Sequence, residues 1–505
     1  MRMTDIYDVV VVGGGINGLT AAAELARAGQ SVCLVEGRDQ LGGFIRSDSL
    51  GDAGYVHDVF SSWHSLFVGG AAYAVLGSDL RRHGLVYCTD DAPDAAVCAS
   101  AAPDGRVTVA YRDPELTAEA FAHDTDRDAY RAMLERTDAG LRTFGSLLTA
   151  ELRDFRRLRD LVSVGRRLGR RQAETLVRDL VTSGRSFVER TFAGAEVDHL
   201  WVPWLLHAGL APDQAGGGLM LPVFAATTHG GGLPVVQGGA GGSRLHASQA
   251  VVASVSPNRL YDTLLAGQSV ADRARREIRG YRYGPGAVQI HLALSAPPPW
   301  TSPVLRRTPL VHLSDGSAGM AIASAQVRAG LLPQRPSVVV GQQYLLDPSR
   351  VPAGAAALWI QLQEAPYAPR GDSAGRIPAR GSWTEEVTTA YLERVIDLIE
   401  EQAPGLRSSI LSRHVMTPVD IERANPNAVR GYGYGGSLEL DQSLLWRPVP
   451  GAARHRTCVP GLWHIGAATH PGHGLSGGSG HLAARMIMKR PPRGGRVFPT
   501  SRSRR

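Results

Sequence analysis

Lysine is almost missing from this chain of 505 residues, and cysteine is rare. Lys489 is the only lysine, so a mechanism that needs a lysine side chain in the body of the protein is excluded. The four cysteines, Cys33, Cys88, Cys98 and Cys458, form no CxxC pair. This spacing disfavours a disulfide framework, a zinc site and a redox-active dithiol. We expect the cysteines to be packing residues.

The sequence also has no apolar run long enough to span a bilayer and no signal-peptide pattern before its first predicted strand. We therefore expect a cytoplasmic protein. Its length exceeds the size at which a single core stops growing, which predicts two or more domains. The net charge of +7 equals the seven basic residues of the acid-free tail 489–505, and no nucleic-acid-binding motif accompanies that tail. We expect no nucleic-acid partner.

A second basic stretch, ELRDFRRLRDLVSVGRRLGRR (151–171), carries eight arginines among apolar residues. Two interpretations are open for it. It is a solvent-facing helix, or it makes a peripheral contact with a membrane surface.

The first strong motif lies in YDVVVVGGGINGLTAAAELARAGQSVCLVE (7–36). Four valines predict a parallel strand buried on both faces, and the glycine run opens an alanine-rich helix. In this run Gly13 permits a tight turn, Gly14 follows it, Gly15 lets a pyrophosphate approach the backbone, and Gly18 lets the helix pack closely on the sheet. The context of strand, glycines, helix and second strand predicts a dinucleotide-binding unit.

The second strand ends on Glu36, eighteen positions after Gly18. A carboxylate there accepts hydrogen bonds from both ribose hydroxyls and repels a 2′-phosphate, which disfavours NADP. No second strand–GxGxxG–helix pattern follows, so a separate nicotinamide domain is not expected.

After Glu36, GRDQLGG (37–43) resembles the extended fingerprint of the flavin-binding amine oxidase and phytoene desaturase superfamily. Further stretches resemble its phytoene dehydrogenase-related branch, which includes carotenoid ketolase-like enzymes. They are GYVHDVFSSWHSLF (54–67), QIHLALSAPPPW (289–300), LLDPSRVPAG (345–354) and GGSLELDQSLLWRPVPG (435–451).

This resemblance implies an α/β protein with a Rossmann-like FAD-binding domain, built on a parallel sheet, and an inserted α+β substrate domain. FAD is the expected cofactor. The FAD-binding parts are 1–75, 235–285 and 431–488, the substrate domain takes the mostly helical 76–234 and then 286–430, and 489–505 is a basic tail. Local patterns agree: 125–205 is mainly helical, 287–294 and 357–363 alternate like half-buried strands, and 384–405 is an amphipathic helix with Val387, Tyr391, Val395 and Leu398 on one face.

A second glycine-rich stretch, HIGAATHPGHGLSGGSGHLAARMI (464–487), looks like the closing segment of that superfamily. The resemblance implies that Gly42, Gly43, Gly466, Ala467 and Gly474 lie along the pyrophosphate and the flavin. The N-terminus of the final helix would point at the flavin ring.

By the same resemblance, His57, Asp58, Tyr434 and His473 are the candidate catalytic residues. For His57 and Asp58 a polar pair that supports a loop and a proton-handling role are both open. Tyr434 either lines a channel for a flat or polyene substrate or belongs to the core. His470 and His473 form an HxxH pattern, but no acidic or sulfur ligand accompanies them, so no metal site is expected.

These observations predict an FAD-dependent oxidoreductase that desaturates, isomerises or oxygenates a lipophilic, polyene-like small molecule. Amine oxidation is disfavoured, because that branch typically uses a lysine near the flavin. One departure supports an alternative. Only residues 243–250 separate Gly242 from the strand in AVVASVSP, which is too short for the helix and adenine-side strands of the family. The alternative is a degenerate flavoprotein relative with a binding or scaffold role and weak or no FAD.

Overall fold

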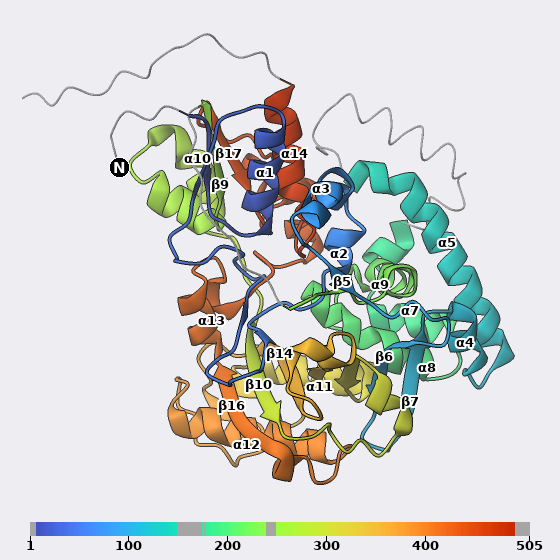
Figure 1. Cartoon of the computed structure of the whole chain (residues 1–505). Helices are drawn as coiled ribbons and strands as arrows, with labels where there is room; N and C mark the ends of the chain where they lie inside the picture. Colours follow the sequence, from blue (N-terminus) through green and yellow to red (C-terminus); the bar gives the residue numbers. More distant parts are fainter. Residues whose placement is uncertain (1–6, 149–173, 176, 239–248, 490–505) are drawn as a thin grey trace, which may run out of the picture.

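The computed structural model describes residues 7–148, 174–175, 177–238 and 249–489 (Figure 1). Two sheets organise these residues, a parallel sheet of four strands and a mixed sheet of seven. The basic stretch 151–171 and the tail after Lys489 lie outside the described residues, so the membrane-contact interpretation stays a prediction. In the described ranges no helix is both long and apolar enough to cross a membrane.

The four-stranded sheet brings together three distant segments of the chain. Its order is β17-β9-β1-β2 and all neighbours are parallel. The strands are β1 (Asp8–Val12), β2 (Val32–Val35), β9 (Gln249–Ser254) and β17 (Leu462–Ile465). The predicted strand of four valines is present, but only Val9 and Val11 are fully buried, while Val10 and Val12 are partly exposed. The prediction of burial on both faces was therefore wrong.

Two helices cover one face of this sheet, α1 (Ile16–Arg27) and α14 (Gly478–Met488). They approach closely, since a Cβ built on Gly480 would lie 1.9 Å from the carbonyl oxygen of Asn17. Glu24 of α1 and His481 of α14 also pair, with 2.7 Å between Oε1 and Nδ1. On the other face α10 (Asp272–Ile278) packs against Ala253 of β9.

The seven-stranded sheet has the order β16-β10-β14-β13-β11-β6-β7, with only β11 and β6 parallel. Its strands are β6 (Ala96–Ala101), β7 (Val107–Tyr111), β10 (Gly286–Leu294), β11 (Leu310–Leu313), β13 (Val338–Gly341), β14 (Ala356–Ala365) and β16 (Ile410–Met416). The predicted strands 287–294 and 357–363 correspond to β10 and β14. They are not half-buried, because both faces of each are covered almost throughout.

Helices cover the two faces of the larger sheet (Figure 1). On one face lies α12 (Glu385–Glu400), and its predicted apolar stripe from Val387 to Leu398 is buried as expected. The hydroxyl of Thr384 accepts a hydrogen bond from the amide of Val387 at 3.2 Å and caps its start.

The other face packs on the helical region, where the predicted helices of 125–205 are found in the described parts. The remaining helices are α2 (Ser65–Val68), α3 (Ala71–Arg82), α4 (Pro114–Glu119), α5 (Asp124–Leu148), α7 (Gly184–Thr191), α8 (Glu196–Trp201), α9 (Gly217–Gly231), α11 (Gly316–Arg328) and α13 (Pro418–Ala424). The short strands are β3 (Ser47–Asp48), β4 (His57–Asp58), β5 (Tyr87–Cys88), β8 (Val235–Val236), β12 (Leu331–Leu332) and β15 (Gly371–Asp372).

Strand β2 is the edge of the small sheet. Among the described residues no strand pairs with it on the side away from β1, and Val35 on this edge is 44% exposed. The sequence predicts that the adenine-side strand is missing, because the segment after Gly242 is short. In the described residues the sheet ends at β2, in agreement with that prediction.

The four cysteines form no disulfide with one another. Cys33 and Cys98 are buried packing residues, as predicted, and burial raises the pKa of Cys98 to about 12. Cys458 is exposed, so the packing prediction is wrong for that residue.

Candidate functional site

The turn between β1 and α1 has the geometry of a phosphate-binding loop. Gly13 adopts φ +101°, and a Cβ on Gly18 would lie 1.9 Å from the carbonyl oxygen of Gly13. Neither position accepts a side chain without moving this turn. Gly15 differs, because a Cβ built there meets no atom within 4 Å. The space beside Gly15 is open at the start of α1.

Glu36 lies directly against this turn at the end of β2. Its carboxylate accepts a hydrogen bond from the amide of Gly14 at 2.7 Å and from the amide of Arg38 at 3.1 Å. The carboxylate of Glu36 is thus held beside the loop, where it could accept hydrogen bonds from the ribose of a nucleotide bound there.

Gly42 and Gly43 join the same loop from a third direction. The amide of Gly42 donates to the carbonyl oxygen of Gly14 at 2.8 Å. A Cβ on Gly43 would lie 3.1 Å from the Cα of Gly15. The backbone of Gly42 and Gly43 is therefore in contact with the backbone of Gly14 and Gly15.

The closing segment lies at the same edge of the parallel sheet. Ser254, the last residue of β9, contacts both glycine runs: its carbonyl oxygen would lie 2.7 Å from a Cβ on Gly13, and its Oγ 3.8 Å from one on Gly466. The amide of Gly466 donates to the hydroxyl of Ser479 at 3.1 Å. A Cβ on Gly477, just before α14, would lie 2.5 Å from Oγ1 of Thr20 in α1. The carboxyl ends of β1, β9 and β17 thus share one edge, which is where dinucleotides bind in such sheets.

The residues present fit a dinucleotide. No side chain caps the N-terminus of α1, and its first turn carries no acidic residue, so its amides are available to a phosphate. The open space at Gly15 lies at the start of α1, and the carboxylate of Glu36 is bonded to the adjacent Gly14. The assignment of individual contacts to the candidate residues stays a prediction.

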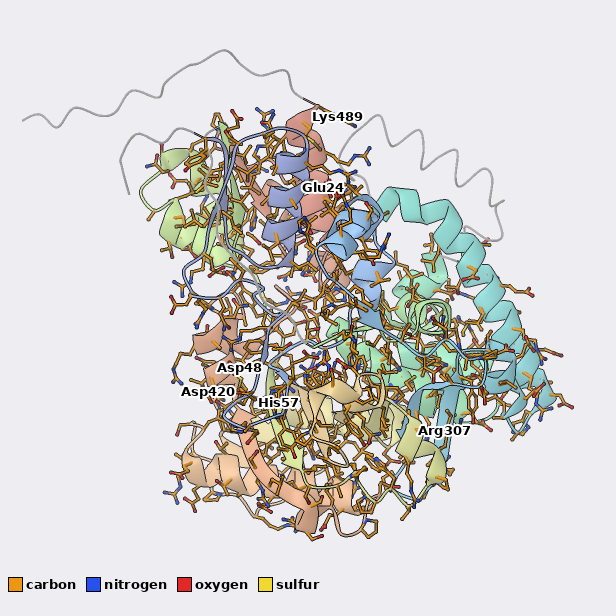
Figure 2. The ribbon with its side chains drawn as sticks, in the orientation of Figure 1. Glu24, Asp48, His57, Arg307, Asp420 and Lys489 are labelled. Carbon is orange, nitrogen blue, oxygen red and sulfur yellow. The ribbon has the colours of Figure 1, made fainter. Side chains whose placement is uncertain are left out.

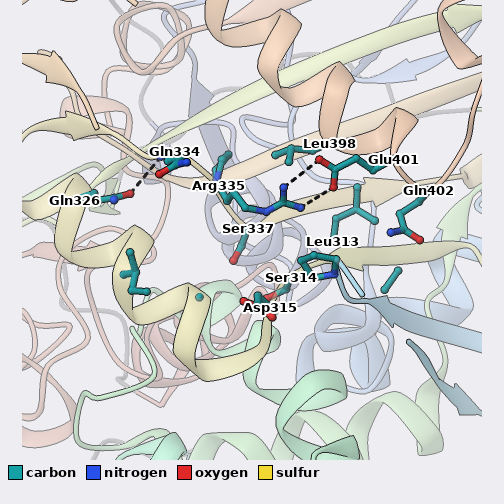
Figure 3. A pocket seen from close by; sticks show the side chains of 15 residues that line it. Leu313, Ser314, Asp315, Gln326, Gln334, Arg335, Ser337, Leu398, Glu401 and Gln402 are labelled. Atoms are coloured by element: carbon teal, nitrogen blue, oxygen red, sulfur yellow. Dashed lines mark hydrogen bonds and ion pairs between the residues drawn. The ribbon is translucent and has the colours of Figure 1, made fainter. Parts of the chain in front are cut away.

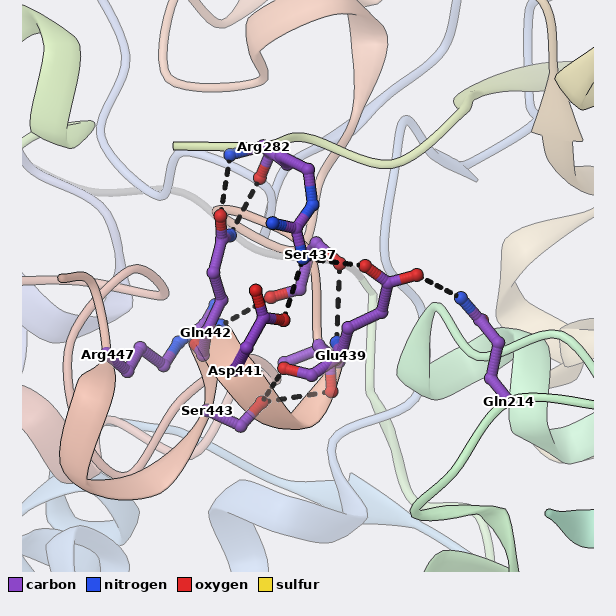
Figure 4. A network of polar contacts seen from close by, with 9 residues as sticks. Gln214, Arg282, Ser437, Glu439, Asp441, Gln442, Ser443 and Arg447 are labelled. Carbon is purple, nitrogen blue, oxygen red and sulfur yellow. Dashed lines mark hydrogen bonds and ion pairs between the residues drawn. The ribbon is translucent and has the colours of Figure 1, made fainter. Parts of the chain in front are cut away.

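Arg447 holds the closing segment in place, and the sequence did not single out this role. The buried guanidinium donates to the carbonyl oxygens of Ala467 at 2.8 Å and 3.1 Å, and of Tyr434 at 2.9 Å. A neighbouring network fixes the same loop (Figure 4). Arg282 donates to Glu439 and Asp441, each at 2.7 Å, and Gln214, just before α9, donates to Glu439 at 2.8 Å. Arg447 lies in the quoted stretch 435–451, but its role could not be inferred from the sequence, because its partners are backbone carbonyls.

Replacing Arg447 by methionine keeps much of the side-chain volume and removes these donors. We expect the free energy of unfolding to fall by about 2 kcal/mol, because several buried carbonyls lose a charged donor at once. FAD affinity should fall as well, since Ala467 loses its support. Urea unfolding followed by circular dichroism measures the first effect. Arg454→Met, in the same region, is the control, and equal stability of both variants would contradict the assigned role.

Tyr434 and His473 come together beside the closing segment. Their ring centroids lie 5.8 Å apart with an interplanar angle of 87°. Burial, assisted by the charge of Arg447, lowers the pKa of His473 to about 3, and burial raises the pKa of Tyr434. Both side chains are therefore neutral near pH 7.

His57 and Asp58 belong to a different cluster. Within the described residues no hydrogen bond, ion pair or ring contact joins either of them to Tyr434 or His473. Figure 2 shows His57 in the half of the molecule that contains the larger sheet, whereas Glu24 of α1 lies in the other half. The structure thus divides the four candidate catalytic residues into two pairs.

Asp58 is an anchor between segments. It accepts hydrogen bonds from Ser47 at 2.6 Å, from Ser62, and from the buried Arg350 at 2.8 Å. Arg350 also pairs with Asp347 at 3.2 Å. These contacts favour the loop-supporting interpretation of Asp58.

His57 packs among other rings, 5.4 Å from His291 and 6.4 Å from His414 by ring centroids. Its Nε2 lies 3.4 Å from Asp52. Burial lowers the pKa of His57 in spite of the nearby Asp52.

Among the described residues no group of three His, Cys, Asp or Glu side chains is arranged to hold a metal ion.

A cavity of about 230 Å³ lies away from the glycine segments, between α11 and α12 (Figure 3). In its lining Arg335 makes two hydrogen bonds to Glu401, at 3.0 Å and 2.7 Å. Its lining mixes polar side chains such as Asp315, Gln326 and Gln334 with apolar ones such as Leu313, Ile322 and Leu398.

The fold and the glycine-lined edge define an α/β protein with a dinucleotide-binding Rossmann-like domain. A sequence model of the NAD(P)-binding Rossmann-like domain matches residues 11–78. A solved structure of putrescine oxidase superposes with a TM-score of 0.56 and 15% identity, covering 96% of this chain and 100% of that chain. The predicted fold class is thereby confirmed.

Proteins with similar sequences narrow the comparison further than the fold does. Pyridine nucleotide-disulfide oxidoreductase domain-containing protein 2 of Rattus norvegicus is 34% identical over 167 residues, 33% of this chain and 27% of the relative. A limonene dehydrogenase chain of Castellaniella defragrans is 24% identical over 95% of this chain and 94% of the relative. Phytoene desaturase (neurosporene-forming) of Rhodobacter capsulatus is 31% identical over 32% of this chain and 29% of the relative.

The match to the first of these relatives spans only about a quarter of its length. Together the relatives confirm the predicted resemblance to the phytoene desaturase-related proteins within the flavin-dependent oxidoreductases.

Proposed function

We propose that this protein is an FAD-dependent oxidoreductase that desaturates, isomerises or oxygenates a lipophilic, polyene-like substrate. The observation that carries the proposal is the meeting of three glycine-rich segments at the carboxyl edge of one parallel sheet, with Tyr434 and His473 beside the last of them. The relatives named phytoene desaturase and limonene dehydrogenase support the lipophilic substrate.

The residues of this chain mainly bind and position. Glu36 would hold the ribose, and the start of α1 would hold the phosphates. Arg447 keeps Ala467 in place, and the neutral rings of Tyr434 and His473 exclude water without adding charge. FAD, when bound, would supply the hydrogen-accepting chemistry.

The open edge of β2 predicts weakened binding of FAD. Without an adenine-side strand, the nucleotide loses two or three hydrogen bonds, and at about 1 kcal/mol each this lowers its affinity roughly 30- to 150-fold. We expect purified protein to lose part of its yellow colour on gel filtration and to recover it when FAD is added.

The test is to denature the purified protein, identify the released nucleotide, and titrate FAD into stripped protein. Recovery of NADP without flavin would refute the cofactor. Tight stoichiometric retention would show that another segment replaces the missing strand. No binding at all would favour the scaffold alternative.

Amine oxidation is a second candidate, because the fold matches putrescine oxidase. The lack of any lysine before Lys489 argues against it. We expect no hydrogen peroxide from FAD-loaded protein with a panel of small amines that includes putrescine. Peroxide that disappears in the Glu36→Arg variant would establish this second function instead.

A further inference from the structure

An apolar loop (residues 444–446) lies exposed on the surface shortly before the closing segment. Leu444, Leu445 and Trp446 follow one another, and these residues are 41%, 43% and 45% exposed. In the described part of the chain no other two consecutive large apolar side chains are exposed. Single exposed apolar residues are ordinary, whereas a group of them marks a contact site.

The backbone of the apolar loop is strained. Leu444 adopts φ +51°, in the left-handed region that leucine rarely takes. A turn of 3₁₀ helix, η10 (Leu444–Trp446), begins at this residue, and none of its side chains is buried. Glycine would adopt this backbone without strain, so stability alone does not explain the leucine. Strain of this kind is concentrated at functional positions.

The apolar loop is tied to the candidate flavin site. The next residue, Arg447, holds the carbonyl oxygen of Ala467, and a Cβ built on Gly472 would lie 3.8 Å from its Nε. A further exposed leucine touches the same segment. Leu66 of α2 is 46% exposed, and a Cβ on Gly474 would lie 2.5 Å from its Cδ1. Exposed apolar groups therefore approach the closing segment from two separate parts of the chain.

The stretch around the apolar loop has no exposed charge. Residues 442–453 read QSLLWRPVPGAA, and their only charged side chain, Arg447, is 3% exposed. Asp441, which precedes this stretch, is paired with Arg282 at 2.7 Å. The stretch thus offers no free charge to a protein partner or to an anionic headgroup.

The backbone of the apolar loop also depends little on water. The amide of Trp446 donates to the carbonyl oxygen of Ser443 at 3.1 Å. The amide of Arg447 donates to that of Leu444 at 3.3 Å, and Pro448 has no N–H group. Unpaired amides are costly in lipid, so a loop whose amides are paired or absent suits a lipid surface.

We propose, on the basis of the function proposed above, that the apolar loop inserts into the surface of a lipid bilayer and places the candidate flavin site at the membrane. Tryptophan favours the membrane–water interface, and leucine favours the adjoining hydrocarbon. The contact is shallow and uncharged, unlike the contact through arginines that is open for the basic stretch 151–171. A lipophilic substrate then reaches the closing segment from lipid without crossing bulk water.

The test is sedimentation of the full-length protein, supplied with FAD, together with sucrose-loaded vesicles of pure phosphatidylcholine. We expect binding that changes little with salt or on addition of phosphatidylserine, because the apolar loop has no exposed charge. Leu444→Gly/Trp446→Ser should lower the partition coefficient about tenfold or more. This variant should fold, because glycine suits the backbone at position 444. Trp446→Phe should bind like the wild type.

Leu411→Ser/Ile322→Ser is the matched control. These residues, in β16 and α11, are 63% and 61% exposed. The control removes as many exposed apolar side chains and should leave vesicle binding unchanged. An equal loss of binding in the control would show that general surface hydrophobicity, and not the apolar loop, carries the binding.

The other outcomes separate this inference from the proposed function. The inference is overturned if phosphatidylcholine is not bound, or if binding needs phosphatidylserine and disappears at high salt. It is also overturned if the wild type dimerises without vesicles while Leu444→Gly/Trp446→Ser stays monomeric, which would assign the apolar loop to a protein interface. These results leave the proposed function standing. That function falls on a separate measurement, the identity of the nucleotide released on denaturation.

Discussion

Alanine in place of Gly15 should weaken FAD binding about 100-fold while leaving the fold intact. The apoprotein has space for the added methyl group, because nothing lies within 4 Å of a Cβ at this position, and the backbone of Gly15 at φ −75° suits any residue. The methyl group would occupy the space that a pyrophosphate needs to approach the amides of α1. Loss of two or three such hydrogen bonds lowers the affinity by about 100-fold.

Isothermal titration of FAD into stripped protein measures this effect, and thermal unfolding of the apoprotein checks the fold. Gly230→Ala is the control, since Gly230 lies in α9 with equally open surroundings. Gly18→Ala should differ from both, because its Cβ would collide with the carbonyl of Gly13 and destabilise the apoprotein itself. Wild-type affinity in Gly15→Ala would show that no dinucleotide approaches this loop.

Removing the carboxylate of Asp58 should have the largest effect on stability. In Asp58→Ala the guanidinium of Arg350, 2% exposed, loses one of its two acidic partners and keeps only Asp347. Breaking a buried ion pair from one side costs about 3 to 5 kcal/mol. Chemical unfolding should report a loss of this size.

The double variant Asp58→Ala/Arg350→Met should recover part of the loss, because it removes the unpaired charge as well. Asp104→Ala, which breaks the exposed pair with Arg106, should leave the unfolding midpoint unchanged. If Asp58→Ala unfolds like the wild type but reduces the rate of flavin reduction, the proton-handling interpretation of Asp58 is correct.

The dinucleotide site could be predicted from the sequence because its determinants are local. A strand, three glycines, a helix and Glu36 follow one another within 30 residues, and β1, α1 and β2 form there. The partners of Asp58 and Tyr434 could not be predicted in this way. Arg350 is separated from Asp58 by 292 positions, and tertiary packing alone brings them together.

The error on β10 and β14 has a physical reason. Alternation of polar and apolar residues usually marks a strand with one wet face. Here the polar positions Gln289 and Gln361 are directed inward and pair with each other. One face of these strands packs in an apolar core, and the other face carries side chains that hydrogen-bond inside the protein. The alternation therefore does not mark a face exposed to solvent.

The small sheet can form only late during synthesis, because its strands come from distant parts of the chain. Strand β1 pairs with β9, and β9 pairs with β17, so its contacts join residues near 10, 250 and 460. Contacts over such separations cost loop-closure entropy before they stabilise anything, and they slow folding. The seven strands of the larger sheet are complete by residue 416. The small sheet, which carries the glycine loop at Gly13, also needs β17, which is synthesised later. We expect a nascent chain to acquire its cofactor only after α14 has been made.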